Sequence, residues 1–145
     1  MSMADILQDF PIRVPPARVF EAVSSPALLD RWWTVRSTGE PRLDAIYELD
    51  FGPGYRWRAV VTRCEPEVAF EWKLTEADRD WTGTRVGFEL VAVGSGTEVR
   101  FHHRGWPEAN EHYRVSCHCW AMYLRLLRRH LEHGESVPYA QRLDA

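Results

Sequence analysis

The chain has 145 residues, of which 45% are hydrophobic and 27% are charged. Its 18 basic and 21 acidic residues leave a formal charge of -3, with no long run of one sign, so we expect no nucleic-acid partner. Nowhere do about eighteen apolar residues run together, which excludes a membrane-spanning helix. Residues 1–10 lack the basic stretch and apolar run of a secretion signal.

The length fits a single domain over residues 1–145, with a core from about residue 5 to residue 134 and a C-terminal tail over 135–145. The chain has three cysteines, an odd and sparse set that favours a reducing cytoplasm over a disulfide-stabilised fold. Seven tryptophans are the unusual feature of the composition. Large rings fill protein cores, but this many also suggest the walls of a pocket.

The N-terminal part predicts a strand followed by two short helices. Residues 6–14 alternate between apolar and polar side chains, and two prolines then end the strand. Residues 17–24 carry apolar side chains at helical spacing. Ser25 precedes Pro26, the arrangement of an N-cap with proline at the first helical position, so a second helix is expected to close near Trp32.

The middle of the chain predicts an antiparallel meander of six strands. A tight reversal over residues 51–55 places Leu49 opposite Trp57 on the inner face. The same register places Glu48 opposite Arg58 on the outer face, where opposite charges stabilise a solvated sheet.

Two further registers follow from the turns at Glu65-Pro66 and Gly94-Ser95. The first predicts that Phe70 lies opposite Val61, Trp72 opposite Ala59 and Leu74 opposite Trp57. The second predicts that Val86 lies opposite His103, Phe88 opposite Phe101 and Leu90 opposite Val99.

A long helix over residues 110–133 ends at Gly134, a residue suited to a left-handed closing position. At about 100° per residue, one stripe of its side chains points in a single direction. This stripe comprises Tyr113, Cys117, Trp120, Leu124, Leu127 and Leu131. The fold class is therefore α+β, with a strongly curved antiparallel sheet of about seven strands wrapped around the C-terminal helix.

Four short motifs carry a family resemblance. They are Pro15-Pro16-Ala17-Arg18-Val19-Phe20-Glu21-Ala22-Val23, Leu28-Leu29-Asp30-Arg31-Trp32-Trp33, Cys64-Glu65-Pro66, and Thr97-Glu98-Val99 leading to Gly105-Trp106-Pro107. With the element order, they resemble the START/SRPBCC superfamily, the helix-grip fold of the birch-pollen allergen, and within it the AHSA-type branch. The resemblance runs from Phe10 to about Leu131. It implies the fold and no single activity, because the superfamily includes lipid carriers, polyketide cyclases and hormone receptors.

Two departures from the family pattern matter. Many members carry paired glycines before the third strand, whereas this chain has Asp44-Ala45, so we expect another turn geometry there. Eukaryotic co-chaperones of this branch join the domain to a separate chaperone-binding domain that this sequence does not encode. We therefore do not expect chaperone activation.

The resemblance and the alternation together predict a cavity between the sheet and the C-terminal helix, for a small hydrophobic or amphipathic molecule. The predicted wall consists of Trp33, Tyr47, Leu49, Trp57, Trp72, Phe88, His103, Trp106, Tyr113, Cys117 and Trp120. Tyr47, Tyr113 and His103 would supply its polar contacts. The alternative is an interior filled by these side chains, since close packing is the default for cores.

His103 is the candidate with the most chemistry. It shares the inner face with Val99 and Phe101, whereas His102 points outward. It could act as acid or base on a bound carbonyl compound in a cyclase or hydrolase. The alternative is a buried histidine satisfied by a backbone carbonyl or by Tyr113. No catalytic pair accompanies it, so we expect a binding protein rather than an enzyme, without a cofactor.

Two segments could gate the cavity. Trp106 joins the last strand to the helix and could close over a ligand, although it could equally belong to the start of the helix. The loop over residues 75–82 is longer than the others, and its Trp81 is expected to be an exposed ring.

A metal site is not expected at Cys117-His118-Cys119. The two cysteines lie about 200° apart on the helix and cannot hold one ion together. As a nucleophile Cys117 would need a base beside it, but His118 points away from it on the helix, and His103 or His112 could serve only if the fold brings them close. We therefore interpret Cys117 as a small buried thiol.

The reverse side of the final helix carries a second apolar stripe of Val115, Cys119, Met122 and Leu126. A stripe of this kind where solvent is expected suggests a contact surface. The sequence therefore predicts a possible homodimer through this helix, and it leaves open a protein-interaction module as a third function.

Overall fold

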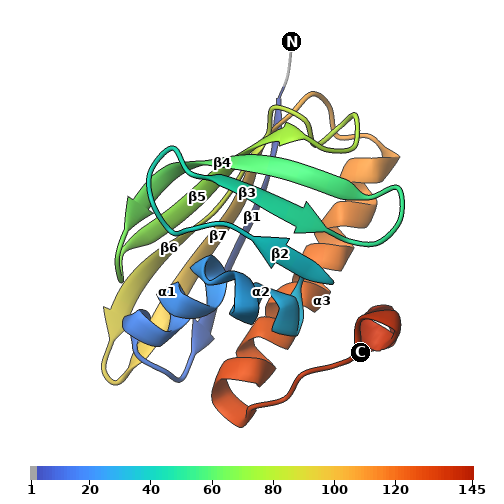
Figure 1. Ribbon diagram of the computed structural model, residues 1–145. Helices are drawn as coiled ribbons and strands as arrows, with labels where there is room; N and C mark the ends of the chain where they lie inside the picture. Colours follow the sequence, from blue (N-terminus) through green and yellow to red (C-terminus); the bar gives the residue numbers. More distant parts are fainter. Residues whose placement is uncertain (1–2) are drawn as a thin grey trace.

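The computed structural model describes residues 3–145. Its elements follow the predicted order of one strand, two short helices, six strands and a long helix, and a short 3-10 helix is added near the C-terminus (Figure 1). In chain order they are β1 (Ala4–Ile12), α1 (Pro16–Ser24), α2 (Pro26–Trp32), β2 (Arg36–Thr38), β3 (Ile46–Asp50), β4 (Arg56–Glu65), β5 (Ala69–Glu76), β6 (Arg85–Val93), β7 (Gly96–Trp106), α3 (Glu111–His133) and η1 (Tyr139–Asp144).

The seven strands form one open antiparallel sheet in the order β1-β7-β6-β5-β4-β3-β2. In Figure 1 this sheet curves around one side of α3, while α1 and α2 lie beside the C-terminal half of that helix. The predicted α+β fold with a curved sheet around a C-terminal helix is confirmed. No helix within residues 3–145 combines the length and apolar character needed to cross a bilayer.

Two of the predicted strand registers are confirmed. Leu49 pairs with Trp57 in the β3–β4 hairpin, where Glu48 also pairs with Arg58. The predicted pairs between β6 and β7 are all present: Val86 with His103, Phe88 with Phe101 and Leu90 with Val99. In both hairpins a short turn and the inward apolar side chains agree on one register.

The predicted register between β4 and β5 is wrong. The turn centres on Glu67, whose φ of 65° is left-handed, instead of lying between Glu65 and Pro66. An irregularity between Val61 and Arg63 then shifts the pairing again, as a β-bulge does. The observed pairs are Phe70 with Cys64, Trp72 with Val61 and Leu74 with Ala59. Trp72 still points inward and is fully buried.

The turn before β3 contains Asp44-Ala45, where the family resemblance predicts a departure from paired glycines. Asp44 has a φ of 67°, a left-handed conformation that aspartate tolerates better than most side chains. Its backbone N–H donates to the carbonyl of Val61 at 3.0 Å. The turn therefore keeps a left-handed residue although it has no paired glycines.

Helix α3 begins and ends as the sequence predicts. The Asn110 side chain accepts a hydrogen bond from the Tyr113 N–H at 3.0 Å, and Gly134 closes the helix with a φ of 69°. In the predicted inner stripe Trp120, Leu124, Leu127 and Leu131 are buried, while Tyr113 and Cys117 are half-buried.

The reverse face of α3 differs from the prediction of a solvent-exposed stripe. Met122 and Leu126 are each only 5% exposed, because α2 and η1 both pack against α3. Cys119 is half-buried and only Val115 is exposed. The C-terminal half of the second stripe is thus covered by the chain itself.

Arg142 fixes the C-terminal tail in this position. Its buried guanidinium donates to the carbonyl oxygens of Asp30 at 2.9 Å, Thr34 at 3.2 Å and Val137 at 2.9 Å. The first two carbonyls belong to the end of α2 and the residues that follow it. The tail therefore bridges α2 and α3.

Candidate functional site

Most of the interior predicted as a cavity is filled by its own side chains. Tyr47, Leu49, Trp72 and Phe88 are at most 1% exposed. The Tyr47 hydroxyl donates to the carbonyl of Ser24 at 2.6 Å, and burial raises the pKa of this phenol above its ordinary value. Tyr47 therefore holds the end of α1 and is not free for a polar contact with a ligand.

His103 is fully buried on the inner face, as the alternation predicts. Trp120 Nε1 donates to its Nδ1 at 3.1 Å, so the proton of the neutral ring is on Nε2, which donates to Thr84 Oγ1 at 2.8 Å. The Thr84 hydroxyl in turn donates to the carbonyl of Trp81. The hydrogen-bond partners of His103 are thus the side chains of Trp120 and Thr84, and not a backbone carbonyl or Tyr113.

The electrostatics of His103 argue against acid-base chemistry. Burial, and secondarily the nearby His102 and His112, lower its pKa to about 3. At neutral pH the ring is uncharged, and both of its nitrogens are engaged within the fold. A general acid or base needs a pKa near the working pH and a nitrogen free for the substrate.

The predicted residues at the junction of β7 and α3 serve as anchors. Trp106 is fully buried and its ring stands at 83° to that of Tyr113, with centroids 5.5 Å apart. The Tyr113 hydroxyl donates to the carbonyl of Asp5 at 2.8 Å. The carbonyl of Cys117 accepts from the Gln8 amide at 3.2 Å. These contacts tie the start of α3 to the sheet, and Trp106 does not form an exposed lid.

An aromatic cleft of about 320 Å³ opens at one end of the interface between the sheet and α3. Its walls come from α3, the end of α2, the turn between β3 and β4, the start of β4, the loop after β5 and the start of η1. It is lined by Trp33, Phe51, Tyr55, Trp57, Asp78, Trp81, His112, Val115, Ser116, Cys119, Trp120, Tyr123 and Tyr139. Of the eleven predicted wall residues, the cleft brings together Trp33, Trp57 and Trp120.

Five rings that line this cleft form a closed circuit of contacts. Trp33 lies 5.2 Å from Phe51, which lies 4.8 Å from Trp57, measured between ring centroids. Trp57 lies 4.8 Å from Trp81, and Trp81 lies 5.8 Å from Trp120. Trp120 returns to Trp33 at 5.3 Å. These separations are typical of favourable aromatic pairs, so each ring restrains its neighbours.

Trp81 is the main residue that the sequence interpretation misplaced. The prediction of an exposed ring in a gating loop is wrong, because Trp81 is 8% exposed and stacks on Trp120 at an interplanar angle of 20°. Its backbone N–H donates to the carbonyl of Asp78 at 2.9 Å, which closes the loop locally. Only the excess of tryptophan in the composition hinted that this ring would be used inside.

Few polar groups line the cleft, and they are mainly acidic or neutral. Within residues 3–145 the Asp78 carboxylate has no hydrogen-bond or ion-pair partner. His112 Nδ1 lies 3.0 Å from Asp80 Oδ2 at the rim. Burial raises the pKa of Tyr123, so its phenol stays neutral. No lysine or arginine occurs among the described lining residues.

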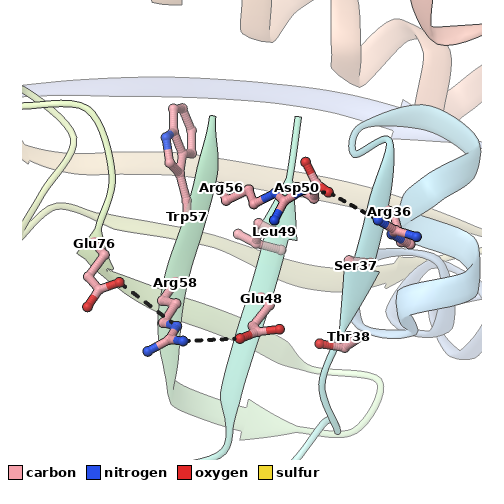
Figure 2. A pocket seen from close by; sticks show the side chains of 10 residues that line it. All are labelled: Arg36, Ser37, Thr38, Glu48, Leu49, Asp50, Arg56, Trp57, Arg58 and Glu76. Atoms are coloured by element: carbon pink, nitrogen blue, oxygen red, sulfur yellow. Dashed lines mark ion pairs between the residues drawn. The ribbon is translucent and has the colours of Figure 1, made fainter. Parts of the chain in front are cut away.

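A second hollow, of about 450 Å³, lies over the outer face of β2, β3 and β4, and it is charged (Figure 2). Arg58 lies 3.4 Å from Glu48, which confirms the predicted cross-strand pair, and 3.9 Å from Glu76. Asp50 pairs with Arg36 at 3.6 Å and with a second arginine, Arg56, at 3.8 Å. Because these charges neutralise one another, the aromatic cleft is the better candidate for a ligand site.

Comparisons with known proteins agree with this fold. Residues 13–132 match the family model described as Activator of Hsp90 ATPase homolog 1-like protein. Among curated proteins, none matches this sequence. The chain is similar to the Aha1 dimer from Colwellia psychrerythraea, whose solution structure is 26% identical, with a TM-score of 0.83 over 92% of this chain and 100% of that one.

Two further solved structures show the same fold at lower identity. A protein from Staphylococcus saprophyticus is 18% identical, with a TM-score of 0.78 over 92% of this chain and 96% of its own. CalU16 from Micromonospora echinospora is 20% identical, with a TM-score of 0.72 over 91% of this chain and 78% of its own. At these identities the likeness concerns the fold alone.

Proposed function

Because this chain belongs to the Activator of Hsp90 ATPase homolog 1-like family, a group with the helix-grip fold, we propose that it binds a small hydrophobic or amphipathic molecule between the curved sheet and α3. The observation that carries this proposal is the aromatic cleft. Ligand pockets are concave, mostly apolar and equipped with a few polar groups, and the cleft has all three properties.

The size of the cleft limits the ligand. Its 320 Å³ lies at the lower end of the range of about 300–1,000 Å³ that is typical of small-molecule pockets. Each 100 Å² of apolar surface that a ligand buries contributes about 2.5 kcal/mol. We assign direct contact to half-buried Trp57 and to Trp81, and a supporting role to Trp33 and Trp120, which line the cleft but are at most 2% exposed, and to the remaining predicted wall residues.

Native mass spectrometry of freshly purified protein tests this proposal. We expect a bound mass on the wild type and its loss in Cys119→Trp, which places a large ring where a half-buried thiol lines the cleft. His118→Trp is the matched control, because His118 is exposed and is not a lining residue. Equal amounts of bound mass on Cys119→Trp and His118→Trp would contradict the proposal. It would also be contradicted if none of the three proteins gained mass in the presence of a saturating concentration of an apolar probe.

An enzyme that uses His103 is the less favoured alternative. Its two ring nitrogens are occupied by Trp120 and Thr84, and its depressed pKa leaves it neutral. The enzyme would become the favoured function if the protein turned over a carbonyl compound, and if His103→Gln abolished this turnover but still bound the compound.

A homodimer is a second proposal, supported by the description of the Colwellia relative as a dimer. Val115 is 52% exposed on α3 and, next to half-buried Cys119, is the part of the predicted stripe available to a second copy. Both residues also line the aromatic cleft, so a second copy bound here would meet the cleft as well. Sedimentation should show a dimer for the wild type and a monomer for Val115→Glu.

We also propose a cytoplasmic location, which the three unpaired cysteines support.

A further inference from the structure

We propose that the cleft prefers a ligand carrying an organic cation, a quaternary or tertiary ammonium group, over a neutral ligand of the same shape. This inference rests on the proposed binding function and names the class of ligand. Two independent features support it: the circuit of aromatic rings and the charge balance of the residues around it.

The rings provide the first part of the argument. The face of an aromatic ring carries negative electrostatic potential, strongest for tryptophan, and attracts a cation within about 6 Å of the centroid. Five rings in mutual contact line the cleft, and four of them are tryptophans: Trp33, Trp57, Trp81 and Trp120. Trp33 and Trp120 are at most 2% exposed and Trp81 is 8% exposed, so half-buried Trp57 offers the most accessible ring of the four. A methylated ammonium group is apolar on its surface and charged overall, so it suits this lining better than a strongly hydrated ammonium does.

The charges provide the second part. The Asp78 carboxylate lines the cleft without a partner in the described part of the chain, and Asp80 lies at the rim with His112. Among the described residues no lysine or arginine lines the cleft, and its one lining histidine, His112, lies 3.0 Å from Asp80. The cation behind the cleft, Arg142, lies 5.4 Å from the Tyr139 ring and is held by backbone carbonyls of the fold. Backbone carbonyls do not cancel the charge of Arg142, so we assign the attraction for a bound cation to the Asp78 carboxylate and the tryptophan rings. The same carboxylate would repel a carboxylate ligand.

The charged hollow on the outer face offers a comparison within the same molecule. There Glu48 and Asp50 each face an arginine, so the strands leave no charge uncompensated (Figure 2). Asp78 differs because its carboxylate is partly buried beside aromatic rings, where screening by water is weaker. Of these two hollows, only the aromatic cleft is thus lined by a carboxylate without an ion-pair partner among the described residues.

A matched pair of probes tests the inference: 4-(trimethylammonio)phenol and 4-tert-butylphenol, which share one shape and differ by one positive charge. Binding is followed through the indole N–H resonances of isotope-labelled protein. Both probes should shift the signals of the cleft tryptophans. The cation should bind about tenfold more tightly, in line with a partly desolvated cation–π contact.

Three variants separate the contributions. Asp78→Asn should reduce the preference for the cation severalfold, whereas Asp9→Asn, which changes an exposed acid on β1, should not. Trp57→Leu should weaken the cation and leave the neutral probe nearly unchanged, because leucine keeps the apolar contact but has no ring. Trp57→Phe should restore part of the preference.

The outcomes distinguish the inference from the proposed function. Equal or tighter binding of 4-tert-butylphenol at the same indole signals would overturn the preference for a cation and leave the apolar site intact. Failure of both probes to shift the cleft indoles would count against the site itself. A preference that persists in both Asp78→Asn and Trp57→Leu would show that neither feature causes it, and would overturn the inference.

Discussion

At the scale of single residues, the outer face of the sheet contains a histidine-carboxylate pair that depends on a glycine. His102 Nε2 lies 2.7 Å from Glu71 Oε2, and both side chains cross over Gly87. A Cβ atom at Gly87 would lie 2.7 Å from the His102 ring and 2.9 Å from Glu71 Cβ. Partial burial alone would raise the pKa of Glu71, but hydrogen bonds from His102 and Thr62 lower it to about 2.

We therefore predict that Gly87→Ala lowers the free energy of unfolding by about 1–3 kcal/mol, the usual cost of overpacking. Urea titration at pH 7 measures the change. In the background of His102→Ala the same substitution should cost less, because the ring that the new methyl group meets is gone. Strict additivity of the two substitutions would show that the contact with His102 is not the cause.

At the scale of elements, the docking of the tail depends on Arg142. Three carbonyl acceptors and a planar donor group make this contact specific to arginine. Arg142→Met should release residues 135–145, seen as faster amide exchange there, and should cost about 1–3 kcal/mol of stability through lost charged hydrogen bonds. Gln141→Met, at an exposed neighbouring position, is the control. Unchanged exchange in Arg142→Met would contradict this role.

The ion pairs on the outer face of β3 and β4 should contribute little. Arg58 and Glu48 are 54% and 60% exposed, and solvent screens exposed pairs strongly. A double-mutant cycle with Arg58→Gln and Glu48→Gln should give a coupling of about 0.5 kcal/mol or less, measured by thermal or urea unfolding. A coupling above about 1 kcal/mol would show that the strands hold this pair more rigidly than its exposure suggests.

Some elements could be predicted from the sequence because local and long-range signals agree in them. In the β6–β7 hairpin a glycine turn and the alternating inward side chains fix one register, so the inward position of His103 was predictable. In the β4–β5 pair the left-handed Glu67 and the bulge near Val61 shifted the register, and neither has a clear sequence signal. Periodicity identified the stripe that contains Met122 and Leu126, but it could not show that packing of α2 and η1 against α3 accompanies their burial.

The same distinction applies to the candidate site. Trp57 and Trp120 lie on regular elements, where spacing gives the direction of a side chain. Trp81, Phe51 and Tyr139 belong to loops or to the short η1 helix, whose irregular backbone sets their orientation. About half of the residues that line the aromatic cleft therefore lie in segments whose side-chain directions cannot be predicted from helix or strand periodicity.

At the scale of the whole molecule, two titratable groups, buried His103 and half-buried Glu71, link stability to pH in the same direction. The pKa of His103 is lowered from 6.5 to about 3, so between these values the unfolded chain binds a proton that the native state does not. The free energy of unfolding should then fall on acidification, by up to about 1.4 kcal/mol per pH unit from this group. Glu71, lowered from 4.5 to about 2, adds a further loss between those values.

Urea titrations at pH 7.5, 6, 5 and 4 on the wild type and His103→Gln test this linkage. Glutamine can accept from Trp120 and donate to Thr84 but cannot be protonated, so stability should change less between pH 6.5 and 4.5 in the variant. His118→Gln removes an exposed histidine and should follow the wild type. Below about pH 4.5 all three proteins should lose stability through Glu71. The prediction would be wrong if the free energy of unfolding fell equally with pH in the wild type and in His103→Gln between pH 6.5 and 5. His103 would then take up its proton in the native state as it does in the unfolded chain, and its hydrogen bonds to Trp120 and Thr84 would not hold it neutral.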